Sequence, residues 1–254
     1  MDKLIRKIIE NFVLSYPHRA DTGWKKPLVA YASANDPLFK ELKIVANPAH
    51  ELPQDFLPEA KTVITYFIPF QDQVIESNKK NLLCSEAWAV SYLETNRLIA
   101  GLNKHLQKLL FEKDYRAVYV PATHNFDEET LLSDWSHRSA AFIAGLGTFG
   151  VNHMLITEKG CCGRIGSLVT DLELPPTARF NNELCLYYAD GSCGKCASQC
   201  VNSALSTEKL DKHKCHEMLL INVELLKHLE NTADVCGKCL VGLPCSYSIP
   251  DKNK

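Results

Sequence analysis

The sequence lacks the features of several large classes of protein. No apolar run approaches the roughly 20 residues that a membrane-spanning helix needs, and no secretory signal peptide is recognisable. The formal net charge is only -2 at pH 7, so the basic excess of nucleic-acid-binding proteins is missing. Low-complexity tracts are also missing. These absences predict a cytoplasmic protein without a membrane partner, and they do not favour nucleic acid as a ligand.

Cysteine, in contrast, is abundant and concentrated in the last third of the chain. Of 11 cysteines, eight lie between Cys185 and Cys245 in two groups, each built around the sequence CGKC. Their spacings are C-x7-C-x2-C-x3-C and C-x20-C-x2-C-x5-C. Two-cluster ferredoxins use paired groups of this kind, and the fourth cysteine of each group binds the other cluster. The crossover rule predicts two 4Fe-4S clusters, one on Cys185, Cys193, Cys196 and Cys245 and the other on Cys200, Cys215, Cys236 and Cys239.

Two other uses of cysteine have to be weighed. Disulfides belong to oxidising compartments, and C-x2-C pairs in intracellular proteins are more often metal-binding or catalytic. The two CGKC sequences could together bind one zinc ion. That site would leave the first and last cysteine of each group without a role, so we favour two clusters. The remaining cysteines, Cys84, Cys161 and Cys162, are interpreted as small buried apolar residues.

Hydrophobic periodicity assigns secondary structure to the rest of the chain. Residues 2–15 and 85–111 show the apolar spacing of amphipathic helices, and Ser85 is placed to cap the second. β-branched and aromatic runs predict strands. The further expected elements are a helix over 131–144, strands over 28–33, 62–68, 115–120, 153–157 and 165–170, and short helices near Ser203 and over 215–226.

This order of elements predicts an α+β fold. Helices and strands alternate up to about residue 175, which is typical of an α/β sandwich, while the loop-rich remainder suits a cluster-binding module. With 46% hydrophobic residues the chain can bury a full core. We expect a cofactor- and substrate-binding domain over 1–178 and a ferredoxin-like module with both clusters over 179–254.

A glycine-rich stretch before the cysteines is the second functional candidate. The sequence AGLGTFG over 144–150 can form a tight turn whose backbone approaches a cofactor, although helix-to-strand packing explains such glycines equally well. Histidines around it could donate protons and arginines could hold an anion. The alternatives are a structural role for each histidine and surface ion pairing for the arginines. Trp88, Tyr92 and Asn96 share one helix face. The candidate catalytic residues are His124, Asp134, His137 and Arg138, and His153 and Arg164 are further candidates of the same kind.

Several of these segments resemble the epoxyqueuosine reductases. The resemblance rests on the AGLG-x-x-G-x-N run, on 155–157, on GSLVTD over 166–171 and on the doubled cysteine groups, and it extends over nearly the whole chain. It is nearest to short, double-cluster members of the iron-sulfur superfamily that also contains the reductive dehalogenases. The position of those enzymes' catalytic aspartate falls on Leu131, and Asp134 is out of register with it.

The resemblance implies a nitroreductase-like core and a base-off corrinoid beside one cluster. Electrons from a low-potential donor such as ferredoxin or flavodoxin would pass through the clusters to the corrinoid, which reduces a small organic substrate; a tRNA substrate stays open. The alternatives are an electron-transfer protein without a substrate and a corrinoid-reducing activator of another protein. The residues expected to line the corrinoid site are Trp88, Tyr92, Asn96, Gly145, Leu146, Gly147, Gly150 and Asn152.

Overall fold

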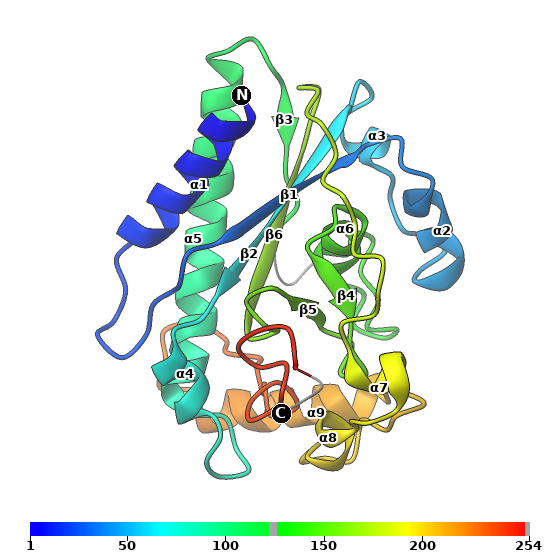
Figure 1. Ribbon diagram of the computed structural model, residues 1–254. Coiled ribbons are helices and arrows are strands. Elements are labelled where there is room, and N and C mark those ends of the chain that lie inside the picture. The colour runs from blue at the N-terminus through cyan, green and yellow to red at the C-terminus, as the bar shows by residue number, and fades with distance from the viewer. Residues whose placement is uncertain (122–125, 252–254) are drawn as a thin grey trace.

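The computed structural model describes residues 1–121 and 126–251, and its centre is a four-stranded antiparallel sheet (Figure 1). The strand order is β1-β2-β6-β3. Both central strands are buried along most of their length, because helices cover the two faces of the sheet. The strand bounds are β1 Leu28–Ser33, β2 Thr62–Pro69, β3 Ala117–Val118 and β6 Gly163–Thr170.

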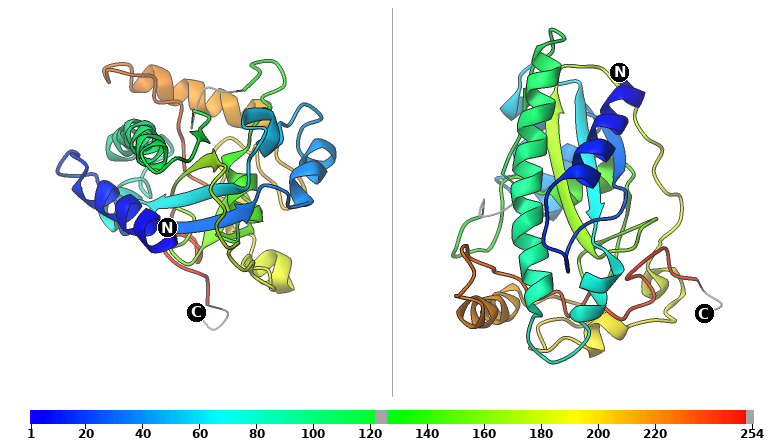
Figure 2. Two further views of the ribbon diagram at one scale, coloured as in Figure 1. Left: turned by 90° about the horizontal axis from the view of Figure 1, so that it is seen from above. Right: turned by 90° about the vertical axis from the view of Figure 1, so that its left-hand side faces the viewer.

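One face of the sheet is covered by α1 (Asp2–Ser15) and the long α5 (Glu86–Phe111), which lie side by side (Figure 2). The Ser85 hydroxyl accepts a hydrogen bond from the Trp88 amide, so α5 begins with the predicted cap. The opposite face packs against α6 (His137–Ile143). Each face therefore has its own apolar core, and α5 extends beyond the sheet toward the cysteine-rich segment.

The remaining elements are short and connect or cover these layers. A second sheet is the hairpin of β4 (Gly147–Phe149) and β5 (Leu155–Thr157). Most of the cysteine-rich segment is loop, and it packs beneath the sheet and the lower end of α5 (Figure 1). The other helices are α2 Leu38–Val45, α3 Pro53–Phe56, α4 Asp72–Ser77, α7 Leu186–Asp190, α8 Lys195–Ser198 and α9 Lys212–Leu225.

The mixture of helices and antiparallel sheets confirms the predicted α+β class, with three corrections. The helix expected over 131–144 begins only at His137, because Leu131 has a left-handed φ of 53° and Ser136 caps the helix. The strand expected over 115–120 is reduced to two residues. A turn with a left-handed φ of 50° at Ser203 replaces the short helix expected there.

The proposed boundary between 178 and 179 falls in the connection from β6 to α7. One apolar core nevertheless includes residues from both sides of it, among them Leu98 of α5 and Leu240 of the cysteine-rich segment. The core fixes the position of the cysteines relative to α5. No helix in the described ranges is long and apolar enough to cross a membrane.

Candidate functional site

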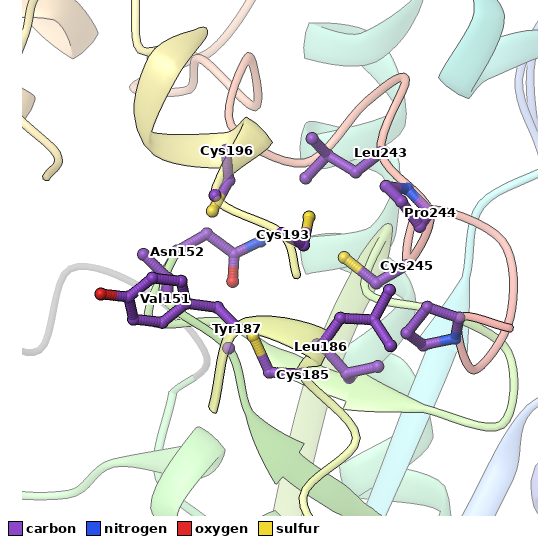
Figure 3. A pocket seen from close by; sticks show the side chains of 14 residues that line it. Val151, Asn152, Cys185, Leu186, Tyr187, Cys193, Cys196, Leu243, Pro244 and Cys245 are labelled. Atoms are coloured by element: carbon purple, nitrogen blue, oxygen red, sulfur yellow. The ribbon is translucent and has the colours of Figure 1, made fainter. Parts of the chain in front are cut away.

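The structure brings the eight clustered cysteines together as two sets. Cys185, Cys193, Cys196 and Cys245 all line one hollow (Figure 3). Cys185 caps α7, Cys196 lies on α8, and Cys245 comes from the C-terminal loop. The pKa of Cys196 is raised to about 11, first by burial and then by the neighbouring thiols Cys245, Cys185 and Cys193. We call these four residues the first thiol set.

The second thiol set consists of Cys200, Cys215, Cys236 and Cys239. Burial raises the pKa of Cys239 well above its usual value, and Cys236, Cys215 and Cys200 contribute to the shift through their charges. Cys196 of the first set contributes least, so the two sets adjoin each other at Cys239. In each set, three cysteines of one sequence group are joined by the last cysteine of the other group, which is the crossover arrangement. The two CGKC sequences therefore lie in different sets and do not form one joint site.

No three His, Cys, Asp or Glu side chains of the described residues are close enough to share one metal ion. The thiols of the first set line a common hollow, so four sulfur ligands are available in one place.

The second CGKC loop is fixed by contacts to three distant parts of the chain. Asn78 Nδ2 donates to the Cys236 carbonyl at 2.9 Å, and Asn152 Nδ2 donates to the Cys239 carbonyl at 3.1 Å. Gly237 has a left-handed φ of 70°, and a Cβ atom there would lie 2.3 Å from the Trp88 ring. The indole is therefore packed directly on the loop. Its Nε1 is buried and has no hydrogen-bond partner among the described residues.

The three leftover cysteines are buried, as predicted, and each lies near the sets or their loops. Cys161 Sγ is 4.0 Å from Cys245 Sγ, and Cys162 Sγ donates to the Leu240 carbonyl at 3.2 Å. The pKa of Cys84 is raised to about 12, first by burial and then by the charge of Cys236. These residues are part of the surroundings of the thiol sets and not only of the apolar core.

Beside the second thiol set lies a group of polar side chains that we call the arginine site: Tyr92, Arg138, Arg164 and Asp234. The Tyr92 hydroxyl donates to Asp234 Oδ1 at 2.6 Å, and the Arg164 guanidinium lies 4.3 Å above the Tyr92 ring. Arg138 Nη1 donates to the His153 carbonyl at 2.8 Å. Surrounding protein, together with the charge of Arg164, lowers the pKa of Arg138, whereas the thiols of the second set act in the opposite direction.

The positive charge of this site extends beyond the two arginines. Burial lowers the pKa of Lys212, and the charge of Arg138 lowers it further. The surrounding protein, Arg138 and Lys212 all lower the pKa of His153. The arginine site therefore presents cations and hydrogen-bond donors next to the second thiol set, which suits an anionic or carbonyl-bearing ligand.

Of the candidate catalytic residues, the structure places Arg138 in the arginine site, with Arg164 and His153 beside it. His124 lies outside the described residues. Asp134 accepts a hydrogen bond from Asn47. Burial lowers the pKa of His137 to about 4. His137 Nε2 donates to the Pro121 carbonyl at 3.1 Å, and its Nδ1 accepts from the Ser167 hydroxyl at 2.7 Å, so both ring nitrogens are occupied.

The predicted lining of a corrinoid site is divided among different places. A Cβ atom at Gly147 would lie 2.0 Å from the Ile156 carbonyl oxygen, because β4 pairs with β5 there. A Cβ atom at Gly145 would lie 2.6 Å from the Ala178 oxygen, and both Gly145 and Leu146 border a groove beside β1. Gly150 and Asn152 line the hollow of the first thiol set. Gly145 and Gly147 therefore serve close packing of the chain, the alternative that the sequence left open for this turn, whereas Gly150 faces the first thiol set.

The aromatic stripe of α5 also has local partners. Trp88 packs on Gly237 and Phe70, and Tyr92 is paired with Asp234. The Oδ1 atom of Asn96 is buried without a hydrogen-bond partner among the described residues. Sequence analysis did not find Asp234 or Asn78, because neither lies in a motif.

Comparison with solved structures finds proteins of similar architecture. The epoxyqueuosine reductase of Streptococcus thermophilus superposes with a TM-score of 0.56 at 17% identity, over 97% of this chain and 66% of that one. An epoxyqueuosine reductase bound to a tRNA-Tyr stem loop gives 0.64 at 17% identity, over 96% and 65%. This chain has the epoxyqueuosine reductase fold. That of Bacillus subtilis gives 0.62 at 15% identity, over 100% and 67%.

The epoxyqueuosine reductase fold is thus confirmed where the sequence only resembles it. The chain spans about two thirds of the length of these structures. No protein-family model and no curated protein matches the sequence. Activity, cofactors and partners of the known epoxyqueuosine reductases are consequently a starting point for a proposal.

Proposed function

We propose that the protein is an iron-sulfur oxidoreductase that passes electrons through two 4Fe-4S clusters to an organic acceptor at the arginine site. The observation that supports this most is the arrangement of eight cysteines as two adjoining four-thiol sets. One set, with Cys239 and Cys215, lies beside Arg138 of the arginine site. Electrons would enter at the first set and leave from the second.

The surroundings of the second set suit a cluster. A cubane bound by thiolates offers sulfur atoms as hydrogen-bond acceptors. The indole of Trp88 packs on Gly237 between two ligand positions, and its buried Nε1 has no acceptor in the part of the chain that the structure describes. A cluster sulfur would satisfy it, because an unpaired buried N–H is costly. When bound, the clusters supply one-electron transfer, and the residues around them set its direction.

The arginine site would bind and orient the acceptor. Arg138 keeps donors that are not used by the His153 carbonyl, and it suits a carboxylate, phosphate or carbonyl group. The Tyr92 hydroxyl, held by Asp234, is a proton-bearing group in the same place. His137 would have a structural role, since both its ring nitrogens already make hydrogen bonds within the protein. Asp234 fixes the Tyr92 hydroxyl in one orientation.

The corrinoid implied by the resemblance fits the structure only in part. The glycine turn is filled by Ile156 and Ala178, so it offers no cradle for a planar ring. Asn96 Oδ1 on α5 is buried and has no hydrogen-bond partner among the described residues. An electron acceptor, whether a corrinoid or another molecule, would therefore bind on the α5 side. The substrate would be a small organic molecule or, as in the neighbour bound to a stem loop, a modified base in tRNA.

The direct test is the metal content of anaerobically reconstituted protein. We expect about eight irons and about eight labile sulfides per chain, four of each for every thiol set. Electron paramagnetic resonance of the reduced protein should show two interacting clusters. One zinc ion without sulfide would exclude the proposal.

A second candidate function is that of an electron carrier with no substrate of its own. The filled glycine turn favours it, because that segment then only packs helix against strand. A corrinoid-reducing activator of another protein is its nearest variant. Adding cob(II)alamin to the cluster-loaded protein separates these options: a base-off spectrum indicates a corrinoid site, and an unchanged spectrum favours the carrier or a different acceptor. An Arg138→Ala variant tests whether the response depends on the arginine site.

A further inference from the structure

The two CGKC sequences are identical, but the structure treats their lysines differently. Lys195, next to Cys196 of the first thiol set, is exposed. Lys238, in the second, is 5% exposed, and its Nζ donates to the Asn78 carbonyl at 2.7 Å and to the Lys80 carbonyl at 2.9 Å. The chain thus contains a matched pair of lysines, one in water and one buried beside Cys236.

The buried ammonium of Lys238 has no neutralising carboxylate. Among the described residues no Asp or Glu lies within ion-pair distance of its Nζ, and its two acceptors are neutral carbonyl oxygens. The ionisable groups that interact with it are the thiols of Cys84 and Cys236. An unpaired buried charge is costly, so its natural counter-charge is the anionic cluster that the second set would hold.

A second cation acts on the same set. Arg138, which lies on α6, interacts with Cys215 and Cys239. The matching lysine of the first CGKC sequence, Lys195, is exposed. The two sets therefore differ in the buried positive charge beside them.

We infer that the buried charge of Lys238 raises the reduction potential of the cluster on the second thiol set above that of the first, which makes the second set the electron sink. Reduction adds one negative charge to a cluster, and a fixed cation nearby stabilises the reduced form, most strongly where water is excluded. The polarity directs electrons toward the arginine site. The inference rests on the proposed function, because it requires two clusters.

The test is a redox titration, followed by electron paramagnetic resonance, of reconstituted wild type, Lys238→Gln, Lys238→Arg and Lys195→Gln. Glutamine removes the charge and keeps an N–H donor for the carbonyls, whereas arginine keeps the charge. We expect Lys238→Gln to lower one potential so that the ratio of reduced to oxidised cluster falls about tenfold at a fixed poise, about 59 mV for one electron. Lys238→Arg and Lys195→Gln should leave both potentials near those of wild type.

Assigning the shift requires a protein with one cluster. In a Cys196→Ala background, which removes a ligand of the first set, the Lys238→Gln shift should persist. The inference is overturned if Lys238→Gln with both clusters bound moves neither potential, or if Lys195→Gln moves one equally. It is also overturned if Lys238→Gln loses the second cluster, because Lys238 is then a structural support. Wild type that binds no clusters would instead refute the proposed function itself.

Discussion

Cys161 Sγ lies 4.0 Å from Cys245 Sγ, and the Cys161 amide donates to the Cys245 carbonyl at 2.9 Å. A cysteine outside the two spaced groups is thus in contact with a member of the first thiol set. Asn152 Nδ2 reaches the same Cys161 sulfur at 4.0 Å and also holds the Cys239 carbonyl. One asparagine therefore connects the surroundings of both sets.

This contact predicts a non-ligand role for Cys161. Cys161→Ala should keep about eight irons per chain, because the four thiols of the first set remain, whereas Cys245→Ala should lose about four. Loss of an S–H donor to a ligand sulfur should also lower the potential of that cluster. Cys162→Ala is the control, since its thiol donates to the Leu240 carbonyl. A loss of iron in Cys161→Ala would instead identify Cys161 as a ligand.

The crossover arrangement can be tested with pairs of substitutions. Cys196 and Cys200 are neighbours in sequence but belong to different thiol sets, so Cys196→Ala/Cys200→Ala should lose both clusters. Cys200 and Cys239 share a set, so Cys200→Ala/Cys239→Ala should lose only one and keep about four irons. Ligation within each sequence group predicts the reverse result. Iron and sulfide analysis of anaerobic samples distinguishes the two.

Gly237 and Gly191 form a matched pair for a steric test. Both have left-handed φ angles, 70° and 77°, but a Cβ atom at Gly191 would meet nothing within 4 Å, whereas one at Gly237 would meet the Trp88 ring. Gly191→Ala should cost about 1 kcal/mol of unfolding free energy, and Gly237→Ala about 2–4 kcal/mol with loss of the second cluster. Denaturant unfolding and iron analysis measure both. Equal costs would show that the indole moves aside.

His137 predicts a dependence of stability on pH. Its folded pKa of about 4 is below the unfolded value of 6.5, so the unfolded state binds more protons between these values. The stability contributed by neutral His137 is present above pH 6.5 and is lost as the pH falls toward 4, on the order of 3 kcal/mol in total. Unfolding of wild type and His137→Gln from pH 7.5 to 5.5 should give a steeper loss for wild type. Parallel curves would contradict this assignment.

Local patterns in the sequence determined the main elements and the candidate ligands. Apolar spacing was sufficient for α1 and α5, because a helix face buried against a sheet needs that period. The strands β1 and β2 followed from β-branched or aromatic runs, and β2 is buried on both faces. The cysteine spacing gave two candidate ligand sets, since ligation imposes short, fixed separations on the chain.

Tertiary structure decided which of the remaining candidates share a site. Tyr92 and Asp234 are 142 residues apart, and no sequence pattern predicts their hydrogen bond. The glycines of the AGLG run read as a possible cofactor turn, but the pairing of β4 with β5 fills the space at Gly147. Lys195 and Lys238 occupy the same motif, and only the packing of the Asn78–Lys80 segment onto the second loop buries one of them. Burial and charge environment depend on contacts between distant segments, so identical sequences acquire different properties.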